Sequence, residues 1–276
     1  MKILFPWLLL LFVSCQQKNK AGTYLLPAKN AAGPIGSVAD SPTVRNSIHV
    51  FTALCDNKYQ GIVPVPAIMG NGQDPANNLY WGWGYGIRTY FNKSKEWKLV
   101  TISTPGYPVH ERLVYKSTIG DFYLVADAYD GRAMKECLQD FMSALSGNNK
   151  KTINAGNQQV GLFGHARLLA FVGHNGLMDL TLPETYMQAD SQKREGIVLA
   201  CYSKSYFSSR FKEAGAYPLL WTSNLFGPEA YSLHDALSGY IRGENAVAIQ
   251  TRAATVYAKF TKCSVPAAKR LLVTGW

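Results

Sequence analysis

The sequence predicts an α/β domain in which a mostly parallel sheet has helices on both faces. Short apolar runs bounded by glycine, such as Leu168–Val172 and Ile197–Ala200, are typical of central strands that are covered on two faces. These runs alternate with stretches of helical periodicity, which favours a parallel sheet between helices. Hydrophobic residues make up 47% of the chain and charged residues 17%, a balance typical of globular proteins.

The first 14 residues predict a secretory signal peptide. Lys2 precedes the apolar stretch Ile3–Val13, which is shorter than the roughly 20 apolar residues that span a bilayer. Its length is that of a signal-peptide core. Phe12-Val13-Ser14-Cys15 resembles a bacterial lipobox, so we expect cleavage before Cys15 and attachment of lipid to its thiol. The alternative is an ordinary signal peptide that is cleaved elsewhere.

Residues 15–46 predict a tether, and residues 47–276 predict one α/β domain. The tether is polar at first and then rich in Ala, Gly, Pro and Ser, a composition that favours an extended linker. We therefore expect a lipoprotein of the bacterial cell envelope, anchored to a membrane and facing the periplasm or the cell surface.

Within the domain, Ile48–Leu54 predicts a buried strand that runs into Cys55-Asp56-Asn57. A long Gly/Pro/Asn-rich loop is expected over 58–78, and helical spacing over 79–91 indicates a helix despite three glycines. Further strands are expected at 97–102, 112–117, 122–126 and 218–222, and helices at 131–145, 204–214, 229–241 and 246–260.

The net charge of +10 comes from scattered basic residues. Such a charge favours anionic lipid or glycan surfaces. No basic stripe with interleaved aromatic residues occurs, so we do not expect nucleic-acid binding.

Five cysteines are present, and an exported protein can form disulfides. Apart from Cys15, four remain, which allow three complete pairings. Cys137 falls in a helical pattern and is expected to be buried, while Cys55 and Cys263 are candidates for one disulfide. The sequence alone does not establish that pair.

Two central strands end in residues that are capable of chemistry. The run 168–173 leads directly into His174, and the run 196–200 leads directly into Cys201. Ligands of open α/β sheets collect beyond the carboxyl ends of the strands. If these strands are neighbours, a base and a thiol meet there, and the helix expected after Cys201 favours its thiolate. Taken singly, such a cysteine is more often a small buried hydrophobe, so the prediction depends on the pair.

The order of these segments resembles the caspase-fold cysteine peptidases, and the legumain-like family most closely. Segments 128–134 and 140–147 resemble the family's turn and helix before the catalytic histidine. Segments 168–183, 197–207 and 219–233 resemble its histidine strand, its cysteine strand and the strand that follows. The resemblance covers residues 48–240. It implies a three-layer caspase-like sandwich and a cysteine endopeptidase that needs no cofactor.

Three positions depart from the family pattern. Asn175 stands between His174 and Gly176, where the family has a glycine directly after the histidine. Leu199 replaces the acidic residue that shapes the asparagine pocket of legumains, so asparagine specificity is not implied. Tyr202 begins a segment that replaces the common small-residue turn.

The expected function is therefore a lipid-anchored peptidase-like hydrolase of the envelope, acting on a peptide or protein. Cys201 is the expected nucleophile, His174 the acid and base, and the Cys201 amide with Gly176 the oxyanion site. Candidate residues of the substrate pocket are Asp56, Asn57, Asn175, Ser223 and Glu229.

Two alternatives remain open at the level of sequence. One is a catalytically inactive domain of the same fold that serves as a binding or assembly module. The other is a different α/β hydrolase, although the chain has no Gly-x-Ser-x-Gly. No histidine or cysteine spacing indicates a metal site.

Overall fold

The structure is a computed structural model that describes residues 44–276, which belong to one compact unit. The expected signal peptide, the lipidation site Cys15 and nearly all of the tether lie outside the described residues, and they stay predictions. Within residues 44–276, no helix combines the length and the apolar composition needed to cross a bilayer.

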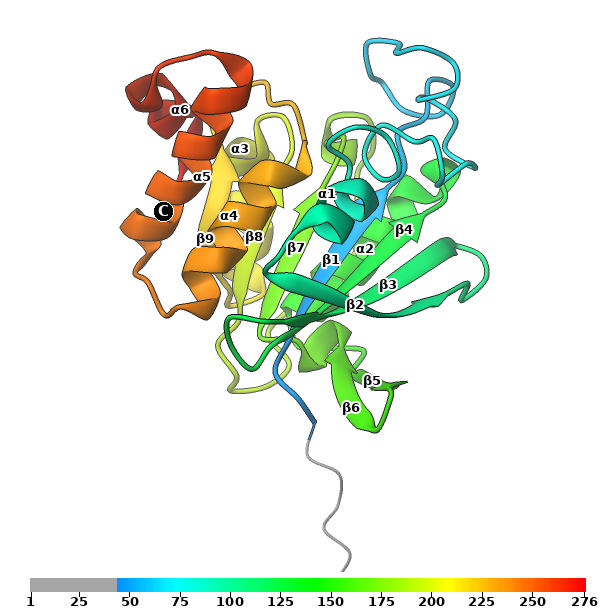
Figure 1. Ribbon diagram of the computed structural model, residues 1–276, viewed down its shortest axis with the longest axis vertical. Coiled ribbons are helices and arrows are strands. Elements are labelled where there is room, and N and C mark those ends of the chain that lie inside the picture. The colour runs from blue at the N-terminus through cyan, green and yellow to red at the C-terminus, as the bar shows by residue number, and fades with distance from the viewer. Residues whose placement is uncertain (1–43) are drawn as a thin grey trace, which may run out of the picture. The chain divides into compact units, whose positions relative to one another are not determined.

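Eight strands form one mixed sheet in the order β10-β9-β8-β7-β1-β4-β3-β2 (Figure 1). The strands are β1 (Ser47–Ala53), β2 (Trp97–Ser103), β3 (Val109–Ser117), β4 (Tyr123–Tyr129), β7 (Leu168–Val172), β8 (Glu195–Leu199), β9 (Tyr217–Thr222) and β10 (Leu272–Val273). The five central strands are parallel, while β2, β3 and β10 add antiparallel edges. The chain thus has the α/β fold with a mostly parallel sheet that its sequence predicts.

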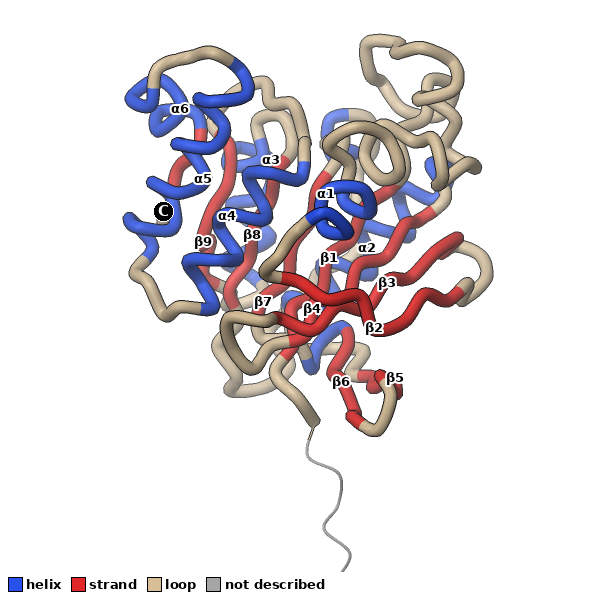
Figure 2. Tube along the Cα trace, viewed as in Figure 1, coloured by secondary structure: helices blue, strands red, loops and turns tan. Residues whose placement is uncertain are grey.

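Helices cover both faces of this sheet (Figure 2). They are α1 (Ile87–Lys93), α2 (Met134–Leu145), α3 (Ser203–Glu213), α4 (Ala230–Ile241), α5 (Ala246–Thr261) and α6 (Val265–Leu271). The side chains of a strand alternate between two cores, because successive residues point to opposite faces. Val50 belongs to the core with α1, α4 and α5, whereas Phe51 belongs to the core with α2 and α3. This alternation explains the continuous apolar runs of the central strands.

One sequence expectation is wrong in extent, and four elements of the structure were not expected. The helix expected over 79–91 is wrong in extent, because residues 79–86 form turns and only α1 is helical. A hairpin of β5 (Lys151–Ala155) and β6 (Gln158–Leu162) was not expected, nor were α6 and β10. The hairpin has largely polar, exposed residues, so it lacks the apolar runs that mark the central strands. The remaining strands and helices are confirmed to within a few residues at their ends.

A buried polar network crosses the sheet at β1, β4 and β3. The Asp127 carboxylate accepts two hydrogen bonds from Arg112, each 2.6 Å long, and a third from His49 Nε2 at 2.9 Å. The backbone N–H of Phe163 donates to His49 Nδ1, so His49 is neutral with its proton on Nε2. Burial opposes ionisation of Asp127, but the hydrogen bonds from Arg112 and the contact with His49 outweigh it and lower the pKa of Asp127.

We expect Arg112→Leu to lower the free energy of unfolding by about 3–5 kcal/mol, because it leaves the buried Asp127 carboxylate without its cation. Urea unfolding followed by tryptophan fluorescence measures the change. Lys98→Leu, which alters an exposed cation on β2, is the matched control and should change stability by less than about 0.5 kcal/mol. Equal effects of the two substitutions would contradict a stabilising role for the network.

Acid should destabilise the fold partly through His49, whose pKa is lowered from 6.5 by burial, against the opposing effect of Asp127. Below pH 6.5 the unfolded chain binds a proton that the folded His49 resists, so stability falls as pH falls. We expect His49→Gln to reduce this slope between pH 7.5 and pH 5.5 by up to about 1.4 kcal/mol per pH unit. Urea unfolding at both pH values tests it, and an unchanged slope would refute it.

Candidate active site at the carboxyl edge of the sheet

The parallel strands β7 and β8 carry His174 and Cys201 to equivalent positions. Val172 pairs with Leu199 at the end of the ladder, and the Gly173 N–H donates to the Leu199 carbonyl at 3.2 Å. His174 and Cys201 each follow this pair by two residues. The register therefore brings the imidazole and the thiol to the same edge of the sheet on neighbouring strands, as the sequence predicts.

Asp179 holds the imidazole of His174. The Oδ2 atom of Asp179 lies 2.6 Å from His174 Nε2 and accepts a second hydrogen bond of 2.9 Å from the Gly61 N–H. An ionised carboxylate only accepts hydrogen bonds, so Nε2 carries the proton and Nδ1 is left as the basic nitrogen. His174 is 8% exposed, and the short 3-10 turn Gly176–Met178 places Asp179 against it.

Cys201 stands on a sharp turn between β8 and α3. The next residue, Tyr202, has φ of +50°, a left-handed conformation that few non-glycine residues adopt, and α3 begins directly after it. Cys201 is partly exposed, and its sulfur lies 3.4 Å from the backbone nitrogen of Phe226, which donates to it. The Cys201 thiol in turn donates to the Phe226 carbonyl at 3.6 Å, so the loop between β9 and α4 contacts the sulfur through both backbone groups of Phe226.

Asn175 connects the two loops that carry these side chains. Its Nδ2 donates to the Cys201 carbonyl at 2.7 Å, while its Oδ1 accepts from the Leu177 N–H at 3.1 Å. Asn175 is fully buried, so it positions the loops and offers no free polar atom. No hydrogen bond joins His174 directly to Cys201 in residues 44–276; the link between their loops is Asn175.

Gly173 and Gly176, which lie on either side of His174, are favoured as glycine for different reasons. Gly173 has φ of +147°, which strongly favours glycine. Gly176 is packed against α2, where an added Cβ would clash with Met134 and approach Leu138 to 3.0 Å. Close packing on α2 thus accounts for Gly176 independently of any oxyanion.

Asp56 and Asn57 follow β1 and fold the loop after it. Asp56 is 3% exposed, and its Oδ1 accepts from the N–H groups of Lys58 and Tyr59. Asn57 exchanges two hydrogen bonds with the backbone of Val65. Both side chains therefore serve the turn, and neither hydrogen-bonds to His174 or Cys201.

Ser223 and Glu229 flank the loop between β9 and α4. The exposed Ser223 hydroxyl donates to the Arg270 carbonyl at 2.7 Å, which fixes the end of β9 to the last turn of α6. Glu229 occupies the residue before α4, and its side chain forms no capping hydrogen bond. Phe226, between these two residues, is the part of the loop that contacts the Cys201 sulfur.

Two residues near the site were missed by the sequence reasoning. Asp179 lies only five residues after His174. That spacing could have identified Asp179 from the sequence, because a short turn can bring such an acid back to the histidine. Tyr80 lies in the turns before α1 and packs against Gly173, where an added Cβ would be 3.5 Å from its ring. Burial, together with the thiols of Cys55 and Cys201 beside it, raises the pKa of Tyr80. No sequence pattern marked this tyrosine.

The four described cysteines are free thiols, so the disulfide considered for Cys55 and Cys263 does not form in this structure. Cys263 is exposed, whereas Cys55 and Cys137 are buried. Burial raises the pKa of the Cys55 thiol to about 11, against an opposing hydrogen bond from Tyr80. Within residues 44–276 no three His, Cys, Asp or Glu side chains are grouped so as to hold a metal ion.

Comparisons with protein-family models, with curated proteins and with solved structures give no match to this chain.

The thiols should react in two classes. We expect iodoacetamide at pH 8 to modify Cys201 and Cys263 in the folded domain, because both are accessible, and to leave Cys55 and Cys137 untouched until urea is added. Mass spectrometry of tryptic peptides locates the modified residues. A Cys201 that stays unmodified in folded protein while Cys263 reacts would show that its sulfur is not available to a substrate.

Proposed function

We propose that this protein is a cysteine hydrolase that cleaves a peptide bond, with Cys201 as nucleophile and His174 as acid and base. The observation that carries the proposal is the arrangement of a partly exposed thiol and an Asp-bound imidazole at equivalent positions of β7 and β8. A nucleophile beside a base that a third group orients is the arrangement used in covalent catalysis.

The reaction follows from these groups. The Cys201 sulfur attacks the carbonyl carbon as the thiol proton passes to His174 Nδ1. The Cys201 backbone N–H, which donates to no group in residues 44–276, stabilises the oxyanion. His174 gives a proton to the leaving amine as the C–N bond breaks, which leaves a thioester on Cys201. Water, deprotonated by His174, then attacks the thioester; the C–S bond breaks, the acid leaves and His174 returns the proton to the Cys201 sulfur. Gly176 is the second oxyanion donor in this proposal.

Asp179 acts through His174 in this scheme. By accepting from Nε2, it fixes the ring orientation and stabilises the imidazolium that forms during turnover. Its second hydrogen bond, from Gly61, attaches the long loop after β1 to the site. We therefore assign Asp179 as a positioning residue.

The cellular setting is part of the proposal. The lipobox-like segment before Cys15 and the tether composition support a lipid-anchored protein of the bacterial envelope, whose substrates are then peptides or proteins that reach that compartment. The resemblance of segments 128–147 and 168–233 to caspase-fold peptidases supports a peptide as the substrate.

A second candidate is a non-catalytic binding or assembly module with the same fold. It is favoured by the hydrogen bonds of the loops, because Asn175 connects them while His174 is bonded to Asp179 and not to Cys201. In that case the two residues would be structural.

A peptidyl acyloxymethyl ketone, which alkylates an activated thiol, separates the two functions. We expect labelling at Cys201, its loss in Cys201→Ala, and a rate at least about 100-fold lower in His174→Ala, since general acid–base catalysis contributes that much. Cys263→Ala, which removes an exposed thiol far along the chain, is the matched control and should leave the rate unchanged.

Labelling at Cys201 that is equally fast without the His174 ring would refute the hydrolase and support the binding module. Circular dichroism of each variant establishes that it is folded. Asp179→Asn should slow labelling less than His174→Ala and should also shift the pH–rate profile, which a purely structural role would leave in place.

A further inference from the structure

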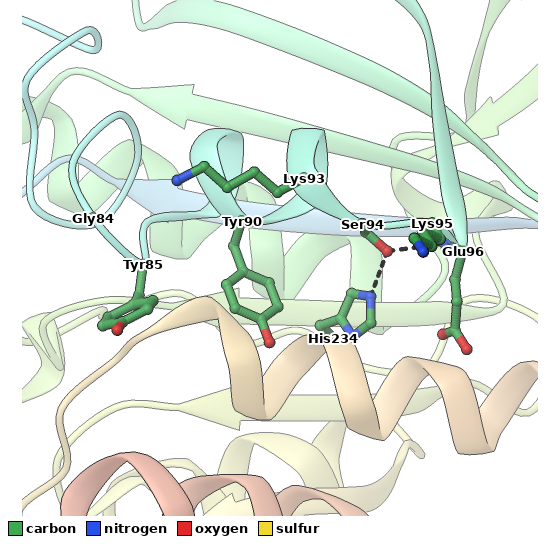
Figure 3. A pocket seen from close by; sticks show the side chains of 8 residues that line it. All are labelled: Gly84, Tyr85, Tyr90, Lys93, Ser94, Lys95, Glu96 and His234. Carbon is green, nitrogen blue, oxygen red and sulfur yellow. Dashed lines mark hydrogen bonds between the residues drawn. The ribbon is translucent and has the colours of Figure 1, made fainter.

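A second group of catalytic residue types lines a cavity outside the site of His174 and Cys201. The cavity has a volume of about 460 Å³ and is formed by residues of the segment 84–96 together with His234 of α4. Figure 3 shows Ser94, the residue after α1, hydrogen-bonded to His234 in the lining of this cavity. Volumes of this size accommodate small organic ligands.

Ser94, His234 and Asp235 form a continuous hydrogen-bonded chain. The Ser94 Oγ lies 2.7 Å from His234 Nε2, and His234 Nδ1 lies 2.9 Å from Asp235 Oδ1. Because an ionised carboxylate only accepts, Nδ1 carries the ring proton and Nε2 accepts from the serine hydroxyl. This is the proton arrangement in which an imidazole removes the proton of an attacking serine.

The imidazole and the hydroxyl are held in place by their surroundings. The His234 ring packs edge-on against Tyr90 and Phe91, with ring centroids 5.4 and 5.5 Å apart, and its side chain is 12% exposed. The Ser94 Oγ also accepts from the Glu96 N–H at 3.0 Å, which would stabilise negative charge on that oxygen. The Lys95 N–H donates to no group in residues 44–276, so it is available to an oxyanion.

The walls of the cavity indicate the class of ligand. The rings of Tyr85 and Tyr90 supply an apolar surface, and Lys93 and Lys95 form no ion pair within the described part of the chain. The one acid in the lining, Glu96, is engaged by Arg242 at 2.8 Å and by the Ser238 hydroxyl. Hydrogen bonding from Arg242 and Ser238 outweighs burial and lowers the pKa of Glu96. The cavity therefore suits a small aromatic or aliphatic group beside an anionic one.

We infer that this cavity is a second hydrolytic site, which cleaves small carboxylic esters through Ser94. Ser94 Oγ bonds to the ester carbonyl carbon as its proton passes to His234 Nε2, and His234 then protonates the departing alkoxide as the ester C–O bond breaks. Water, deprotonated by His234, attacks the acyl group on Ser94, and the carboxylic acid leaves as the serine regains its proton. The step needs neither Cys201 nor His174.

A fluorophosphonate probe, which phosphonylates activated serines, tests this site on the folded domain. We expect mass spectrometry to place the label on Ser94, and we expect none in Ser94→Ala. His234→Gln should slow labelling at least about 100-fold, the contribution of a general base. Ser208→Ala, which removes a serine hydroxyl that is hydrogen-bonded to the Lys204 carbonyl within α3, is the matched control and should leave labelling unchanged.

Asp235→Asn supplies a readout that separates catalysis from structure. The variant should slow labelling and shift its pH–rate profile, whereas loss of a merely structural hydrogen bond would leave the profile in place. A p-nitrophenyl acetate assay should show turnover that Ser94→Ala abolishes. A folded wild-type domain that is not labelled, a label on another serine, or a rate unchanged in His234→Gln would each overturn the inference.

Discussion

The parallel pairing of β7 with β8 is the constraint on which the site at the sheet edge depends. Five registered pairs, ending at Val172 and Leu199, fix how far each strand extends before its loop begins. A shift of one residue would exchange the two faces of β8 and move Cys201 away from the Phe226 amide. Beyond this last pair, the Asn175 side chain holds the two loops together, because its amide donates a hydrogen bond to the Cys201 carbonyl.

The sheet can hold this register because its centre is stabilised from both sides. Apolar cores of α1, α4 and α5 on one face and of α2 and α3 on the other enclose β1, β7 and β8. The buried charges of Arg112 and Asp127 are paired with each other and with His49, since an unpaired charge there would be costly. The rigid centre leaves the loops beyond the strands free to carry chemistry.

His174 and His234 illustrate different ways of building a site. His174 follows a strand, and its acid, Asp179, comes from a turn just after it. His234 lies within α4 and faces a serine that is 140 residues earlier in the chain, while its acid is the next residue of the same helix. The first arrangement is set by sheet register, and the second by the packing of α1 on α4.

The sequence by itself determined the α/β class, the central strands and most of the helices, and the delivery of His174 and Cys201 to one sheet edge. It could do so because apolar runs and helical periodicity are local signals, and parallel strands carry their ends to a common edge. Only the tertiary structure assigned Asn175 to the contact between two loops, Gly176 to packing on α2, and Asp179 and Tyr80 to the site. It alone placed Ser94 beside His234, because contacts between distant residues depend on how elements pack, which no local pattern encodes.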